Sequence, residues 1–111
     1  MRLYLLEDFT SENIAAITGR LNEMELSGAM EGIYWLPCPQ DLLSDVQKEH
    51  TDECGPHCMA LEIDGKTLRL ELLVRARNKL RCECVSYASE ELRAHMIKYI
   101  DDMLTELDIY V

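Results

Sequence analysis

Apolar and polar residues alternate most regularly between residues 57 and 74, which is typical of strands with one buried face. The apolar positions of one parity are Met59, Leu61 and Ile63 before the Asp64-Gly65 pair, and Leu68, Leu70, Leu72 and Val74 after it. Asp-Gly is a favoured two-residue hairpin turn. The sequence therefore predicts a hairpin whose turn is Asp64-Gly65 and whose register places Leu61 opposite Leu68.

A third strand is expected over residues 80–87, after a turn at residues 76–79. Leu80, Cys82 and Cys84 share one parity on this strand. Reduced cysteines behave as small apolar side chains. We therefore expect both thiols to lie in the core, and the three strands over residues 57–87 to form an antiparallel meander.

Spacings of three and four between apolar residues predict three helices. They cover residues 11–26, 39–53 and 89–107. Two short strands, residues 2–6 and 32–36, are apolar on both sides and flank the first helix. The apolar stripe of the last helix is expected to lie on the inner face of the meander.

The element order is therefore strand, helix, strand, helix, three strands and helix, which predicts an α+β fold built as a two-layer sandwich. The sheet is expected to be antiparallel, or mixed if the first strand, helix and strand form a right-handed parallel crossover. The chain has 111 residues, which is enough for one core. We expect one domain over residues 1–111.

The charge of the chain argues against two classes of partner. Asp and Glu number 21 against 11 Lys and Arg, a net charge of −10 that repels phosphate backbones and anionic lipid surfaces. The longest aliphatic run, residues 72–74, is far shorter than a membrane span, and residues 1–8 lack the apolar stretch of a signal peptide. We therefore expect a cytoplasmic protein that binds neither nucleic acid nor membranes.

The densest set of metal-ligand residues lies between residues 50 and 58, within a chain whose five cysteines are expected to be reduced. His50, Cys54 and His57 are the first candidate ligands, with Cys58 as the alternative to its neighbour His57. Nitrogen and sulfur donors suit zinc. A fourth position would be filled by water, by Asp52 or Glu53, or by a second subunit. The alternative interpretation is a polar loop with one buried thiol.

Motifs of common enzyme classes are absent from the sequence. It has no glycine-rich phosphate loop, no serine-nucleophile elbow and no HExxH helix. A Cys/His nucleophile in residues 50–58 has no evident orienting carboxylate or oxyanion hole. We therefore assign no catalytic or cofactor-binding residue and expect a protein without catalytic activity.

The outward side of the predicted sheet is unusually apolar for a small protein. Leu73, Val85 and Tyr87 are expected on it, with Arg69 and Arg75 at its rim. Large apolar patches mark contacts, so either the helix over residues 39–53 covers this face or another subunit does. The sequence predicts an interaction or regulatory module that self-associates as a symmetric homodimer or binds another protein. The alternative is a zinc-binding protein using residues 50–58.

Overall fold

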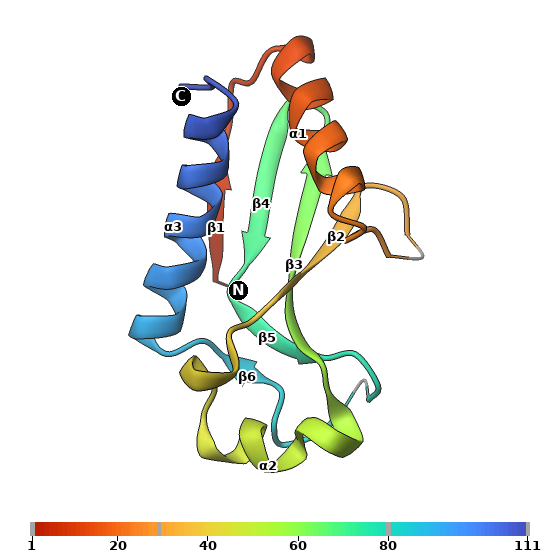
Figure 1. Cartoon of the computed structure of the whole chain (residues 1–111), viewed down its shortest axis with the longest axis vertical. Helices are drawn as coiled ribbons and strands as arrows, with labels where there is room; N and C mark the ends of the chain where they lie inside the picture. Colours follow the sequence, from red (N-terminus) through yellow and green to blue (C-terminus); the bar gives the residue numbers. More distant parts are fainter. Residues whose placement is uncertain (1, 29, 80, 111) are drawn as a thin grey trace.

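The computed structural model describes residues 2–28, 30–79 and 81–110. Its elements are β1 (Leu3–Leu6), α1 (Ser11–Glu23), β2 (Ile33–Pro37), the short 3₁₀ helix η1 (Gln40–Leu42), α2 (Asp45–Cys54), β3 (His57–Asp64), β4 (Thr67–Glu71), β5 (Leu73–Ala76), β6 (Ser86–Tyr87) and α3 (Glu90–Glu106). This order confirms the predicted α+β class. In the view of Figure 1 the strands are seen between α3 on the left and α1 on the right, and α2 lies at one end of the molecule.

Six strands form the sheet, in the order β1-β4-β3-β5-β6, with β2 also paired to β3. Every strand pair among the described residues is antiparallel. The first two strands are not neighbours, since β1 pairs with β4 and β2 with β3. Of the two predicted arrangements, the antiparallel sheet is therefore the one that forms.

The β3–β4 hairpin has the predicted faces but a different register. Leu61 pairs with Leu70, and Asp64 pairs with Thr67, so the two-residue turn is Gly65-Lys66 instead of Asp64-Gly65. Gly65 takes a positive φ of 60°, which suits the first position of a tight hairpin turn. The shift is two residues along the partner strand, so the side-chain parity is unchanged.

The strand expected over residues 80–87 is reduced to β6, and the prediction that Cys82 and Cys84 lie on a strand is wrong. The backbone N–H of Val85 donates to the carbonyl of Cys82 at 3.0 Å, which closes a turn around the two cysteines. Leu80 lies outside the described residues. A local turn therefore replaces the strand in the segment that carries both thiols.

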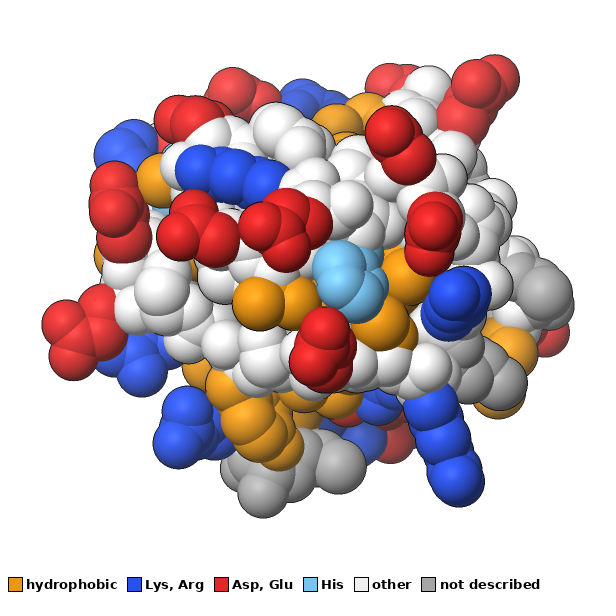
Figure 2. Space-filling model, turned by 90° about the horizontal axis from the view of Figure 1, so that it is seen from below, with side chains coloured by type: hydrophobic (Ala, Val, Ile, Leu, Met, Phe, Trp, Pro, Cys, Tyr) orange, Lys and Arg blue, Asp and Glu red, His pale blue; other side chains and the backbone are white. Residues whose placement is uncertain are grey.

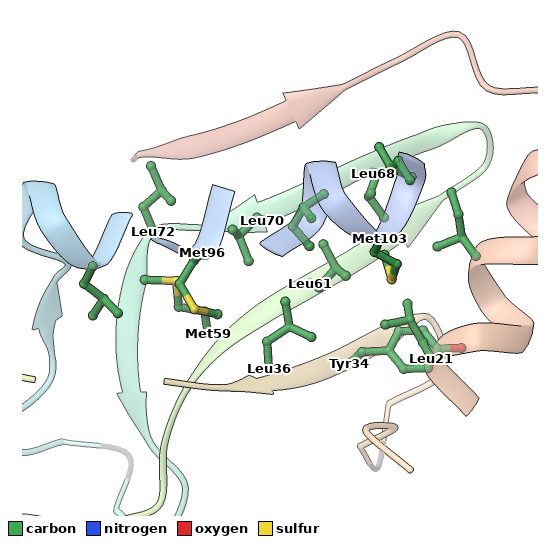
Figure 3. Close-up of a cluster of buried hydrophobic side chains, with 14 of the residues drawn as sticks. Leu21, Tyr34, Leu36, Met59, Leu61, Leu68, Leu70, Leu72, Met96 and Met103 are labelled. Atoms are coloured by element: carbon green, nitrogen blue, oxygen red, sulfur yellow. The ribbon is translucent and has the colours of Figure 1, made fainter. Parts of the chain in front are cut away.

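The main core lies between the inner face of the sheet and helices α1 and α3 (Figure 3). Leu61 and Leu70 from the sheet are at most 1% exposed. The predicted stripe of α3 is buried at Leu92, Met96, Ile100, Met103 and Leu104. None of the described helices is both long enough and apolar enough to cross a membrane.

Helix α2 begins later than the predicted residue 39, and the reason is a capping box. The Ser44 hydroxyl accepts from the backbone N–H of Gln47, and the Gln47 side chain accepts from the backbone N–H of Ser44. This reciprocal pair satisfies two backbone donors at the helix start. Residues 40–42 form only the short helix η1. Leu43, which lies between η1 and Ser44, has an extended backbone.

The outer face of the sheet is not covered by α2, which lies beyond the end of the strands (Figure 1). A hollow of about 380 Å³ opens on this face. Its lining comprises Leu3, Met30, Ile33, Trp35 and Ala60 together with Glu62, Arg69, Glu71 and Arg75. Of the two coverings considered from sequence, the helix is therefore excluded.

Candidate metal centre

One histidine and three cysteines from two separate segments meet at the α2 end of the molecule. His50 and Cys54 lie four residues apart on α2, so both face the same side of the helix. Cys82 and Cys84 come from the turn before β6. The donor atoms of all four residues lie within 4.8 Å of one another.

The distances among His50, Cys54 and Cys82 can be compared with the edges of a tetrahedron around zinc. Bond lengths of about 2.3 Å to sulfur and 2.0–2.1 Å to nitrogen imply edges of about 3.8 Å between sulfurs and about 3.6 Å between sulfur and nitrogen. Cys54 Sγ lies 3.7 Å from Cys82 Sγ and 3.8 Å from His50 Nδ1. His50 Nδ1 lies 3.0 Å from Cys82 Sγ. Two of these three edges therefore have zinc dimensions and the third is contracted, while the Cys84 sulfur lies within 4.8 Å of the other three donors.

The group lies at the surface of the molecule with its sulfurs on the inside. Cys54 and Cys84 are fully buried beside Ala76, in a small cluster separate from the main core. His50 and Cys82 are half-buried. Figure 2 views this end of the molecule and shows a histidine side chain among side chains of the hydrophobic class, which includes cysteine, and acidic ones.

Hydrogen bonds to the backbone hold the two segments together independently of any metal. The buried Gln47 side chain donates to the carbonyl of Cys84 at 3.0 Å. Asn78 donates twice to the end of α2, from its backbone N–H to the Cys54 carbonyl at 3.0 Å and from its side chain to the Gly55 carbonyl at 2.6 Å. These bonds preorganise the four donors, which lowers the ordering cost of binding an ion.

The local electrostatics differ among the three thiols. The backbone N–H of Cys84, joined by smaller contributions from Cys84, Cys54 and His50 side chains, lowers the pKa of Cys82 to about 7. Burial raises the pKa of Cys84 to about 12 and also raises the pKa of Cys54. Thiolate is the form that binds metal. The buried pair therefore needs a bound cation to become thiolate, whereas Cys82 is close to that form at neutral pH.

Glu83 lies beside the ring nitrogen of His50 that faces away from the sulfurs. Its carboxylate Oε1 lies 3.5 Å from His50 Nε2, on the opposite side of the ring from the sulfurs. A carboxylate that accepts from one ring nitrogen fixes the tautomer and makes the other nitrogen a better ligand. Nδ1, which faces Cys54 and Cys82, is the ring nitrogen placed to bind an ion.

The structure brings together two of the four residues named from the sequence. His50 and Cys54 are in the group, whereas His57 and Cys58 lie on β3 and are not part of it. After Gly55-Pro56 the chain enters the sheet, where Cys58 lies between Pro37 and Arg75 of the neighbouring strands. Asp52 and Glu53, the predicted fourth ligands, are exposed and outside the group.

Cys82 and Cys84 were missed as ligands because the parity pattern assigned them to a core strand. The signal that could have identified them is their Cys-x-Cys spacing, which follows the polar stretch Arg77-Asn78-Lys79 after two intervening residues. The His-x₃-Cys pair on α2 and the Cys-x-Cys pair are the two halves of one site.

The residues predicted for an interaction surface are spread over the outer face. Arg69 is paired with Glu62 and Asp64, each at 2.7 Å, and Arg75 with Glu71 at 2.6 Å. Leu73 is half-buried and Tyr87 is 42% exposed. Val85 instead packs against the small cluster formed by Cys54, Ala76 and Cys84.

His57 stays buried without polar contacts, and this predicts an acid-sensitive fold. Both ring nitrogens lack a hydrogen-bond partner among the described residues. Burial, with a smaller effect of nearby His50, lowers the pKa of His57 below its ordinary 6.5. Below pH 6.5 the His57 imidazole takes up a proton in the unfolded chain but stays neutral in the folded chain. The free energy of unfolding therefore falls as pH falls.

The measurement is the free energy of unfolding of wild type and of His57→Phe between pH 5 and 8, compared at equal zinc content. We expect the variant to lose less stability on acidification than the wild type. Identical pH dependence of the two proteins would show that His57 is not held neutral by burial.

Comparison with models of protein families, with curated proteins and with solved structures found no match.

Proposed function

We propose that this protein is a zinc-binding interaction domain in which His50, Cys54, Cys82 and Cys84 hold one zinc ion. The observation that carries the proposal is the convergence of the four donor atoms within 4.8 Å. Three sulfurs and one nitrogen fill a tetrahedral zinc shell. A shell completed by protein donors is typical of structural zinc, whereas catalytic zinc keeps a position for water or substrate.

The weak packing of α2 supports a structural role for the ion. Only Gln47 and Cys54 are buried in this helix of ten residues. Isolated helices of this length are marginal in water and need tertiary contacts to persist. Few apolar side chains of α2 supply such contacts, so bonds from His50 and Cys54 to zinc would anchor the helix to the segment around Cys82.

Beyond zinc binding, we propose that the protein acts in protein interaction or regulation and does not catalyse a reaction. The open, partly apolar outer face of the sheet is the candidate contact surface, for a second copy or another protein. All five cysteines are free thiols, which fits a reducing compartment such as the cytoplasm.

Hydrogen exchange with and without zinc tests the structural role. We expect the amides of α2 to be protected in zinc-loaded protein and to exchange quickly after chelation, because the helix loses its anchor. The amides of α3 are the internal control and should remain protected, since α3 packs on the main core. Protection of α2 that does not change on chelation would contradict the proposal.

Replacing Glu83 with Gln should weaken zinc binding by about tenfold, the lower end of the range for outer partners of metal-ligating histidines. The amide no longer favours the Nε2 proton of His50, so Nδ1 becomes a poorer donor. The measurement is competition with a zinc chelator of known affinity. Glu49→Gln on the exposed side of α2 removes the same charge and is the matched control. Equal losses in both variants would mean that only net charge matters.

A further inference from the structure

Strand β1 ends the sheet with an unprotected edge. It pairs with β4 on one side, and no described residue pairs with it on the other. Its sequence, Leu3-Tyr4-Leu5-Leu6, has none of the charges or prolines that blunt the edges of monomeric sheets. The edge of β2 differs, because Trp35 donates to Leu26 at 2.8 Å and the segment there covers it.

The hydrogen-bonding groups on this edge belong to Leu3 and Leu5. Leu72 donates to the carbonyl of Arg2 at 3.0 Å, so the backbone of Arg2 faces β4. Backbone groups of successive residues in an antiparallel pair point alternately toward and away from the partner. Those of Leu3 and Leu5 therefore point away from β4, toward the free edge.

The same two residues expose apolar side chains beside the edge. Leu3 is 40% and Leu5 is 45% exposed, although both lie in a regular strand. Leu3 also lines the hollow on the outer face. The edge thus combines free backbone donors and acceptors with an apolar strip on the same two residues.

The strand is complementary to a second copy of itself. In an antiparallel pair centred on Tyr4, Leu3 of each copy lies opposite the partner's Leu5, so four free N–H and four free C=O groups are brought face to face in two hydrogen-bonded pairs. Side chains of equal parity stay on the same face, and the four leucines form one apolar row. No side chain therefore has to move to the other face of the sheet when the two strands pair.

Charges at the strand ends favour the same antiparallel arrangement. Exposed Arg2 precedes the strand, and exposed Glu7 and Asp8 follow it. Pairing two copies head to tail brings the basic start of each strand to the acidic end of the other. These opposite charges offset part of the repulsion between two chains that each carry a net charge of −10.

We propose that two copies of this chain pair through β1 to form a two-fold dimer with one continuous sheet. This deepens the interaction role proposed above and does not depend on the zinc ion. The outer faces of both copies lie on the same side of the joined sheet. Their two hollows then flank the row formed by Leu3 and Leu5 of each copy.

Light scattering coupled to gel filtration on zinc-loaded protein at micromolar concentration tests the proposal. The expected mass is twice the 12.8 kDa of the chain. Leu5→Pro removes one edge N–H without removing a bond to β4, and Leu5→Lys places a charge in the apolar row; both should give the monomer mass. Val46→Lys, at an exposed apolar position on α2, is the matched control and should remain dimeric.

Circular dichroism and zinc content of each variant show that it is folded. A zinc-loaded wild type of 12.8 kDa would overturn the dimer while leaving the zinc site intact. So would a folded Leu5→Pro or Leu5→Lys protein that stays dimeric, or an assembly larger than two chains. A wild-type protein that forms the dimer but does not hold zinc would instead overturn the proposed metal centre and leave the dimer intact.

Discussion

Replacing Cys54 with Ser should reduce bound zinc from one ion per chain to a small fraction. Cys54 is fully buried, and its sulfur lies 3.7–3.8 Å from two other donor atoms of the group. A hydroxyl at this position cannot supply a thiolate. Zinc bound to the folded chain at a thousand times its Kd contributes about 4 kcal/mol to the free energy of unfolding, and we expect the variant to lose this contribution.

Metal analysis of protein prepared without chelators and denaturation with and without added zinc measure this effect. Cys38→Ser is the control, because Cys38 is a half-buried cysteine outside the group. It should keep one zinc and the zinc-dependent stability. Retention of zinc by Cys54→Ser at the wild-type level would contradict the metal centre.

Replacing Leu61 with Ala should destabilise the protein by about 2–5 kcal/mol, the usual cost of removing a buried leucine side chain. Leu61 is fully buried on β3 between the sheet and the helices (Figure 3). The free energy of unfolding from a urea titration measures the loss. Met30→Ala is the control, because Met30 is 68% exposed and its truncation should change stability by no more than about 0.5 kcal/mol.

A cost for Leu61→Ala as small as that for Met30→Ala would contradict the assignment of the inner face. Zinc content should be unchanged in both variants, since neither residue belongs to the metal-binding group.

The fold could be predicted where a long periodic pattern had to bury one face. The alternation over β3 and β4 assigned Leu61 and Leu70 to the core, and the spacing in α3 assigned Met96 to it. Register could not be predicted as well, because a turn shifted by one residue changes the pairing by two and leaves the parity intact. Both positions of the turn place the same side chains inside.

The pattern failed where a short segment satisfies its groups through local and distant contacts. Cys82 and Cys84 alternate like strand residues, but a turn closed by Val85 and the bond from Gln47 to the Cys84 carbonyl hold them instead. Local sequence propensities carry no information about the contact between Gln47 and Cys84, which are 37 positions apart. For this reason the expected third strand of the meander is reduced to the short strand β6.

Two of the four residues of the candidate site could be predicted from the sequence. His50 and Cys54 were found because their spacing of four places them on one side of a helix. His57 and Cys58 were named because they are near in sequence, but the chain turns into β3 there and neither residue belongs to the group. The remaining ligands come from a second segment, and only the fold brings the two segments together.

X-ray absorption at the zinc edge on the zinc-loaded protein tests the central claim most directly, because it counts the donors around the ion. The proposed centre predicts three sulfurs at about 2.3 Å and one nitrogen at about 2.0–2.1 Å. A shell with one sulfur and two nitrogens or with two sulfurs and one nitrogen, as the ligands named from residues 50–58 would give, or a shell of oxygens, would contradict it.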